Sequence, residues 1–228
     1  MSAKKVIFLH GYAQSASIFS GKTGGLRKTL KKQGYESIYI NAPMKLKGDQ
    51  LHDPSSEELD LYGWWPYGMD DYEVQPAIDL VLGQTNGDEQ VEGIIGFSQG
   101  AGLSGAIVAK YKEALPSLKW VVFFSGFRLK PAKFDHWYDS KIDLPSLHVI
   151  GELDTVVEEG RSIRLLDSCI DEKKTLLKHQ GGHYVPNNKD FVNKVVAWIQ
   201  ANGIEKIEEK NEIDDDDLMA QIDNLGKA

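Results

Sequence analysis

The stretch from residue 91 to residue 109, VEGIIGFSQGAGLSGAIVA, constrains the fold of this chain more than any other. Its first five residues, Val91–Ile95, are apolar and partly β-branched, which predicts a short buried strand. From Gln99 onwards the residues are small or apolar and repeat with helical spacing. The small residues at positions 102, 105, 106 and 109 share one stripe, which would let a helix lie very close to a sheet. The stretch therefore predicts a strand, a tight turn and a closely packed helix.

The turn between this strand and this helix has the pattern G-x-S-x-G, in the residues GFSQG at positions 96–100. At such an elbow the serine is held in a strained backbone conformation, with its hydroxyl clear of the sheet. The two glycines remove Cβ atoms that would collide, and the N-terminus of the following helix adds positive potential for an oxyanion. The pattern alone also occurs in ordinary tight turns. The strand before it and the small-residue helix after it favour a nucleophilic Ser98.

Five other apolar segments predict strands, and the segments between them predict helices. The expected strands are 5–9, 37–40, 91–95, 119–124, 146–150 and 174–178, and the expected helices are 15–33, 73–82, 99–109, 160–170 and 190–202. This alternation predicts an α/β fold with a six-stranded, mostly parallel, doubly wound sheet and helices on both faces. Ligands of such sheets bind beyond the carboxyl ends of the strands where the strand order reverses. If the first and third strands flank this reversal, Tyr12 and Ser98 meet there.

Composition indicates one globular domain followed by an acidic segment. The chain has 228 residues, of which 41% are hydrophobic and 26% are charged. Its net charge of −8 is uneven, because residues 205–228 contain nine acidic residues and three lysines, which leaves about −2 on the rest. We therefore expect a catalytic domain over residues 1–203 and a flexible tail over residues 204–228, with no affinity for nucleic acid.

The acidic tail has two interpretations. A solvated, disordered segment accounts for its charge. Alternatively, the four aspartates at positions 214–217 begin a short amphipathic helix, whose apolar face consists of Leu218, Met219, Ile222 and Leu225. Such a helix would dock on a protein partner or on the body of the chain itself.

A single cysteine, Cys169, lies within the expected helix 160–170 and rules out an internal disulfide. Proteins without disulfides are typical of reducing compartments. The apolar run Val6–Leu9 is too short for a signal peptide, and no run approaches the length of a membrane span. We expect a cytoplasmic protein, with the nucleus as the second candidate compartment.

A serine hydroxyl is a weak nucleophile at neutral pH unless a neighbouring base accepts its proton. Among the six histidines, His183 follows an expected strand, and a Gly-Gly pair before it gives a flexible turn toward Ser98. His179, at the end of the same strand, is the second candidate. His148 lies inside a strand and is more typical of a hydrogen-bonded core residue.

The base needs a carboxylate that lies between serine and histidine in the chain, at the end of a strand. Asp154 closely follows the expected strand 146–150, and Glu152 is its rival; an aspartate in such a place is also a common helix cap. The oxyanion hole needs two backbone N–H groups. Gln99 supplies one by its position after the serine, and Tyr12, after the neighbouring strand, is the natural second donor.

An irregular segment from residue 41 to residue 71 contains the aromatic run LYGWWPYG. Loops of this length in a compact domain are often lids or binding loops. We expect Trp64, Trp65 and Tyr67 to hold an apolar acyl group. Because adjacent side chains of an extended stretch point to opposite sides, one tryptophan should face the site while the other fills the core.

Four motifs occur in order along the chain: HGYAQS, GFSQGAGLSG, PSLHVIGELD and GGHYVPN. Together they resemble the fungal family of serine hydrolases, to which a human ovarian-cancer candidate hydrolase is akin, from about residue 5 to residue 202. The resemblance implies an α/β-hydrolase fold and a triad of Ser98, Asp154 and His183, and it favours Asp154 over Glu152. It also implies hydrolysis of small-molecule carboxyl esters or thioesters through an acyl-enzyme. The segment containing NAP and GWW is similar to acyl-protein thioesterases.

Two other functions stay open at this point. The fold could serve as an acyl-binding or interaction module without chemistry. Residues 16–23, ASIFSGKT, also match a loose phosphate-loop pattern that would indicate a nucleotide-dependent enzyme, although bulky Ile18 and Phe19 argue against a glycine-rich cradle. The histidines are not spaced as metal ligands and one cysteine cannot build a thiolate site, so we expect neither a metal nor a cofactor.

Overall fold

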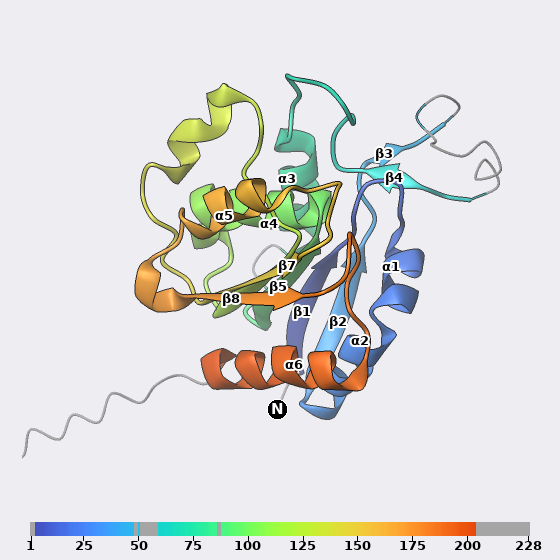
Figure 1. Ribbon diagram of the computed structural model, residues 1–228, viewed down its shortest axis with the longest axis vertical. Helices are drawn as coiled ribbons and strands as arrows, with labels where there is room; N and C mark the ends of the chain where they lie inside the picture. Colours follow the sequence, from blue (N-terminus) through green and yellow to red (C-terminus); the bar gives the residue numbers. More distant parts are fainter. Residues whose placement is uncertain (1–2, 48–49, 51–58, 86–87, 204–228) are drawn as a thin grey trace, which may run out of the picture.

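The computed structural model describes residues 3–47, 50, 59–85 and 88–203. Figure 1 shows one central sheet with helices on both sides. The acidic segment 204–228, with its two interpretations, lies outside the described residues.

A six-stranded sheet forms the centre of the molecule, in the order β2-β1-β5-β6-β7-β8, and each neighbouring pair is parallel. The strands are β1 (Lys4–Leu9), β2 (Tyr35–Ile40), β5 (Val91–Phe97), β6 (Trp120–Phe124), β7 (Ser146–Gly151) and β8 (Lys174–His179). The strand order reverses at β1, which pairs with β2 on one side and with β5 on the other. The predicted doubly wound sheet is confirmed, and β1 and β5 flank the reversal.

Helices cover both faces of this sheet (Figure 1). One face carries α1 (Ala16–Lys22), α2 (Gly24–Lys32) and α6 (Lys189–Gly203), and the other carries α3 (Gln75–Thr85), α4 (Gln99–Lys110) and α5 (Glu159–Leu166). The connections contain the short 3₁₀ helices η3 (Lys112–Ala114), η4 (Ala132–Tyr138) and η5 (Asp171–Lys173). Strands β5 and β6 are buried throughout because both apolar cores take side chains from them. Within the described residues, no helix combines the length and the apolar character needed to cross a membrane.

The helix predicted over residues 15–33 is in fact two helices, α1 and α2, which meet at Thr23. The hydroxyl of Thr23 donates to the carbonyl of Phe19 at 2.7 Å, and the N–H of Gly25 donates to Oδ1 of Asn187 at 2.9 Å. Side-chain partners therefore compete with the helical ladder where two glycines already weaken it. The phosphate-loop pattern at residues 16–23 falls on α1, so this segment is a helix and not a glycine-rich loop.

Two further segments differ from expectation. Cys169 lies beyond the end of α5, where the backbone of Ile142 bonds to residues 168 and 170 on either side of it; the cysteine is fully buried. The segment expected to be irregular contains a small antiparallel pair, β3 (Met44–Lys45) and β4 (Tyr62–Gly63). Strands of two residues are too short to leave an alternating pattern in the sequence.

Candidate active site

Ser98 lies between β5 and α4 with φ 53° and ψ −117°, in a region of backbone space that few non-glycine residues adopt. Its N–H donates to the carbonyl of Phe124 on β6 at 2.9 Å, which ties the turn to the neighbouring strand. The turn is also crowded, because a Cβ on Gly100 would lie 2.1 Å from the carbonyl oxygen of Leu9. The structure thus contains a strained strand-to-helix elbow around Ser98.

His183 approaches Ser98 from the loop after β8. Its Nε2 atom lies 3.0 Å from Oγ of Ser98, within hydrogen-bond distance. The ring packs on Phe97, with centroids 4.7 Å apart. The N–H of Leu153 donates to the carbonyl of Gly181 at 3.0 Å, which ties the loop after β7 to the loop that carries His183. The Gly-Gly turn, expected to be flexible, is therefore anchored.

Asp154 binds the opposite edge of the His183 ring. Its Oδ2 accepts from Nδ1 of His183 at 2.8 Å, and its Oδ1 accepts the N–H groups of Val156 and Val157, both at 2.9 Å. Burial disfavours the ionised carboxylate, but hydrogen bonds from Val157, His183 and Ser125 outweigh burial and hold the pKa of Asp154 below its ordinary value. An ionised carboxylate only accepts, so Nδ1 carries the proton and Nε2 is the acceptor toward the serine hydroxyl.

Ser125, at the end of β6, is a site residue that the sequence reasoning missed. Its Oγ donates to Oδ2 of Asp154 at 2.7 Å, and this oxygen also accepts from His183. The residue has φ 47°, and its N–H donates to the carbonyl of Val149 on β7 at 2.9 Å. The sequence offers one signal, a Ser-Gly pair after an expected strand, but only the pairing of β6 with β7 brings Ser125 to Asp154.

Three other histidines make contacts away from Ser98. Burial lowers the pKa of His10 to about 4, and its Nε2 accepts the N–H of Ala42 at 3.0 Å. Burial also lowers the pKa of His148, inside β7, to about 3. His179 uses its Nδ1 to accept a backbone N–H two residues further on, at 3.2 Å. Glu152 is exposed, whereas the side chain of Asp154 is 1% exposed.

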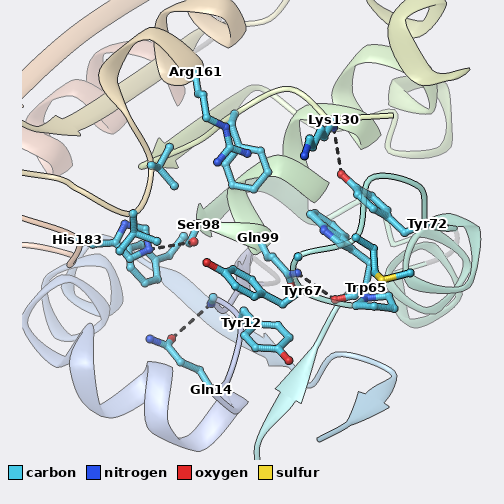
Figure 2. A pocket seen from close by; sticks show the side chains of 18 of the residues that line it. Tyr12, Gln14, Trp65, Tyr67, Tyr72, Ser98, Gln99, Lys130, Arg161 and His183 are labelled. Atoms are coloured by element: carbon cyan, nitrogen blue, oxygen red, sulfur yellow. Dashed lines mark hydrogen bonds between the residues drawn. The ribbon is translucent and has the colours of Figure 1, made fainter. Parts of the chain in front are cut away.

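A cavity of about 760 Å³ opens beside Ser98. Figure 2 shows Ser98 and His183 on one side of it, Trp65 and Tyr72 on the other, and Tyr12 and Tyr67 between them. Apolar and aromatic side chains form much of the lining, and these include Trp65, Pro66, Tyr67, Met69, Tyr72, Phe97, Phe127, Val156 and Val157. The cavity can therefore accept a group with a substantial apolar surface next to the serine hydroxyl.

The three aromatic residues expected at the substrate site occupy different places. Trp65 and Tyr67 line the cavity, and the Trp65 ring stacks on Tyr72 with centroids 5.2 Å apart. Trp64 points into the core instead: it is 2% exposed, and its Nε1 donates to the carbonyl of His10 at 2.7 Å. Trp64 does not line the cavity, which corrects its assignment to the acyl site. The physical reason is that side chains alternate along an extended chain, so only one of the two adjacent rings enters the cavity.

Gln99 has a role that its position after the serine does not reveal. Its side-chain Oε1 accepts the N–H of Trp64, and its Nε2 donates to the carbonyl of Trp65, both at 3.0 Å. The first residue of α4 thus fixes the aromatic segment over the elbow. Tyr12, the other expected oxyanion donor, follows β1 and lines the same cavity as Ser98.

Comparison with known proteins identifies relatives of the chain. A family model described as "Serine hydrolase (FSH1)" matches residues 1–195. "Family of serine hydrolases 3" of Saccharomyces cerevisiae is 39% identical over 261 aligned positions, and the alignment covers 98% of each chain. "Esterase OVCA2" of Danio rerio is 32% identical over 207 aligned positions, and the alignment covers 80% of this chain and 90% of the relative.

Solved structures share the fold at lower identity. The crystal structure of esterase PE8 has a TM-score of 0.63 at 22% identity and covers 88% of this chain and 93% of its own. Zea mays acyl-protein thioesterase 2 has a TM-score of 0.60 at 18% identity, with 90% and 95% covered. The parallel sheet and the elbow after β5 are those of the α/β-hydrolase fold. The chain belongs to the serine hydrolase (FSH1) family.

Proposed function

We propose that the chain is an esterase or thioesterase that forms an acyl-enzyme on Ser98. The observation that carries the proposal is the hydrogen-bonded series Ser98, His183 and Asp154, with Ser98 facing the cavity. The relatives and structural neighbours include an esterase and an acyl-protein thioesterase, which supports an acyl group on oxygen or sulfur as the substrate.

In the proposed mechanism, Nε2 of His183 removes the proton of Ser98 as Oγ attacks the carbonyl carbon of the ester. The backbone N–H groups of Gln99 and Tyr12 bind the negative oxygen of the tetrahedral intermediate, and the N-terminus of α4 adds its dipole. Protonated His183 gives its proton to the leaving alkoxide or thiolate, while Asp154 stabilises the imidazolium. Water then attacks the acyl-enzyme by the same steps and regenerates the serine.

The acyl group is proposed to be apolar and to lie against Trp65 and Tyr67. Trp65 is 5% exposed and stacked on Tyr72, so it offers a rigid wall, whereas Tyr67 is 58% exposed at the mouth of the cavity. Each methylene that moves from water onto such a wall contributes about 0.8 kcal/mol. Medium or long acyl chains are therefore expected to react better than acetate.

Steady-state kinetics with nitrophenyl esters of increasing acyl length, beside thioesters of the same acyl groups, test the chemistry. Ser98→Ala removes the nucleophile, and loss of a triad member lowers turnover by about 10⁴- to 10⁶-fold. Turnover of both substrate types should fall together because one serine serves both. Turnover that persists at the wild-type rate in Ser98→Ala would contradict the proposal.

The acyl wall is tested with the same series in two tryptophan variants. Trp65→Ala should reduce kcat/KM for octanoate esters about tenfold more than for acetate esters, because it removes wall area that only longer chains reach. Trp64→Phe alters the adjacent ring outside the cavity and should change all chain lengths by one factor. If Trp65→Ala also acts by one common factor, Trp65 is not the acyl wall.

We also infer a cytoplasmic location, with the nucleus as the second compartment, and a protein partner for the acidic segment. The cysteine of the chain is free and buried, which supports a reducing compartment. Imaging of a tagged chain tests the location.

Truncation after Gly203 tests the acidic segment and should leave ester turnover unchanged. A loss of turnover would contradict the inference that this segment only binds a protein partner.

A further inference from the structure

The cavity beside Ser98 has cationic residues on one wall. Lys130, Arg161 and Arg164 line it, and no Asp or Glu lines it among the residues that the structure describes. The chain as a whole carries a net charge of −8, so its composition does not account for an excess of cations here. The cavity therefore favours a ligand that is apolar on one side and negatively charged on the other.

The three cations differ in how far their charge is already compensated. Lys130 forms an ion pair with Asp70. Arg164 is exposed to solvent, which screens its charge. Arg161 is half-buried, and in the described part of the chain no carboxylate pairs with it; Glu159, in the same helical turn, pairs with Lys178 instead. Arg161 is therefore the cation with the most to gain from an anionic ligand.

The position of Arg161 is fixed by packing. Its guanidinium lies over the ring of Phe127, 4.2 Å from the centroid, and Figure 2 shows the side chain reaching from α5 toward the cavity. Stacking on an aromatic face leaves the N–H groups at the edge of the guanidinium available. Those groups form the planar fork that binds carboxylate or phosphate through two hydrogen bonds. A half-buried guanidinium held in this way is prepared for an anion at a defined place.

We infer that the substrate carries an anionic group, a carboxylate or a phosphate, which Arg161 binds while the apolar part of the substrate contacts the aromatic wall. This inference rests on the proposed esterase or thioesterase function, because Ser98 and Arg161 line the same cavity. It narrows the substrate class to esters or thioesters with a negative charge on the acyl chain or on the leaving group.

Two pairs of substrates locate the charge. The nitrophenyl monoester of suberic acid and nitrophenyl octanoate differ in a terminal carboxylate on the acyl chain. Octanoyl-4′-phosphopantetheine and octanoyl-pantetheine share the thioester and differ in one phosphate on the leaving group. For each pair the quantity of interest is the ratio of kcat/KM for the charged substrate to kcat/KM for its neutral partner.

Arg161→Gln should lower this ratio about 10- to 100-fold in at least one pair, since it removes charge-assisted hydrogen bonds to the anion. Arg161→Lys keeps the charge and should lower the ratio less. Lys28→Gln makes the same change of charge on α2, across the sheet, and should leave the ratio at its wild-type value. A ratio in Arg161→Gln within about twofold of wild type in both pairs would overturn the inference.

A binding measurement separates this inference from the proposed function. Calorimetry on Ser98→Ala compares octyl hydrogen succinate, which is anionic, with octyl methyl succinate, which is neutral. Adding Arg161→Gln should weaken the anionic ligand at least tenfold more than the neutral one. If the wild type hydrolyses no ester or thioester, the proposed function fails, and the binding measurement alone then tests the role of Arg161. Equal weakening of both ligands would overturn the inference that Arg161 binds an anionic group.

Discussion

The catalytic half and the aromatic half of the cavity are held in place by different means. The proposed catalytic side chains Ser98, Asp154 and His183, together with Ser125, which contacts Asp154, follow four neighbouring strands, β5 to β8. Backbone hydrogen bonds between these strands and loops position them. The aromatic half, residues 64–74, depends on hydrogen bonds that join a side chain to backbone groups far away in the chain. Gln99 binds the backbone of residues 64 and 65, and Tyr72 accepts the N–H of Lys130 at 3.0 Å.

The two halves should therefore differ in how strongly a single substitution disturbs their structure. Many core residues together determine the register of the parallel sheet. A single substitution in the core therefore does not displace the strand ends that carry the proposed catalytic side chains. The aromatic half depends on a few buried polar contacts, and loss of one leaves its partner unsatisfied. Chemistry and substrate preference should therefore be separable by mutation.

The largest effect is expected within the catalytic half. Asp154→Asn should favour the wrong tautomer of His183 and lower kcat by about 10⁴-fold, measured with nitrophenyl esters. Glu152→Gln is the matched control, because this carboxylate follows the same strand and is exposed. Equal losses in the two variants would remove Asp154 from its proposed role.

The link between the two halves is tested by Gln99→Leu, which keeps the backbone N–H and removes both side-chain hydrogen bonds. The buried N–H of Trp64 and carbonyl of Trp65 then lose their partners, at a cost of about 1–3 kcal/mol each. Chemical denaturation should show the free energy of unfolding lowered by about 2–6 kcal/mol. A free energy of unfolding equal to wild type in Gln99→Leu would show that the two side-chain hydrogen bonds of Gln99 do not stabilise the fold.

Acid should act on the aromatic half through His10, whose Nε2 accepts the Ala42 N–H. Burial lowers its pKa to about 4, so between pH 6.5 and pH 4 the unfolded chain binds a proton that the folded chain does not. The free energy of unfolding should fall by about 2–3 kcal/mol from this group between pH 6.5 and pH 4.5. His10→Gln should reduce that slope, measured by denaturation at the two pH values; an unchanged slope would contradict the assignment.

A smaller effect is expected from Ser125→Ala, which removes one donor from the Asp154 carboxylate. Loss of one hydrogen bond to a charged group should lower kcat about tenfold and leave KM nearly unchanged, because Ser125 orients Asp154 without touching substrate. Ser168→Ala removes another hydroxyl, bonded to the carbonyl of Arg164, and should leave kcat at its wild-type value. A change in KM with an unchanged kcat would contradict the role of Ser125 in positioning Asp154.

The sequence predicts the catalytic half better than the aromatic half, for a physical reason. The elbow around Ser98 depends on residues adjacent in the chain, whose glycines, strand and helix leave a local pattern. The contact of Gln99 with the aromatic segment joins residues about 35 positions apart, and the contact of Ser125 with Asp154 requires the order of the strands. The alternation of Trp64 and Trp65 predicts that they face opposite ways, but not which ring enters the cavity.

Covalent labelling locates the proposed nucleophile directly. A fluorophosphonate probe reacts with an activated serine, and mass spectrometry of the digested protein identifies the modified residue. One equivalent of probe is expected on the peptide that contains Ser98, and no labelling is expected in Ser98→Ala. Labelling of a different residue, or none on the folded wild-type chain, would contradict the proposed role of Ser98.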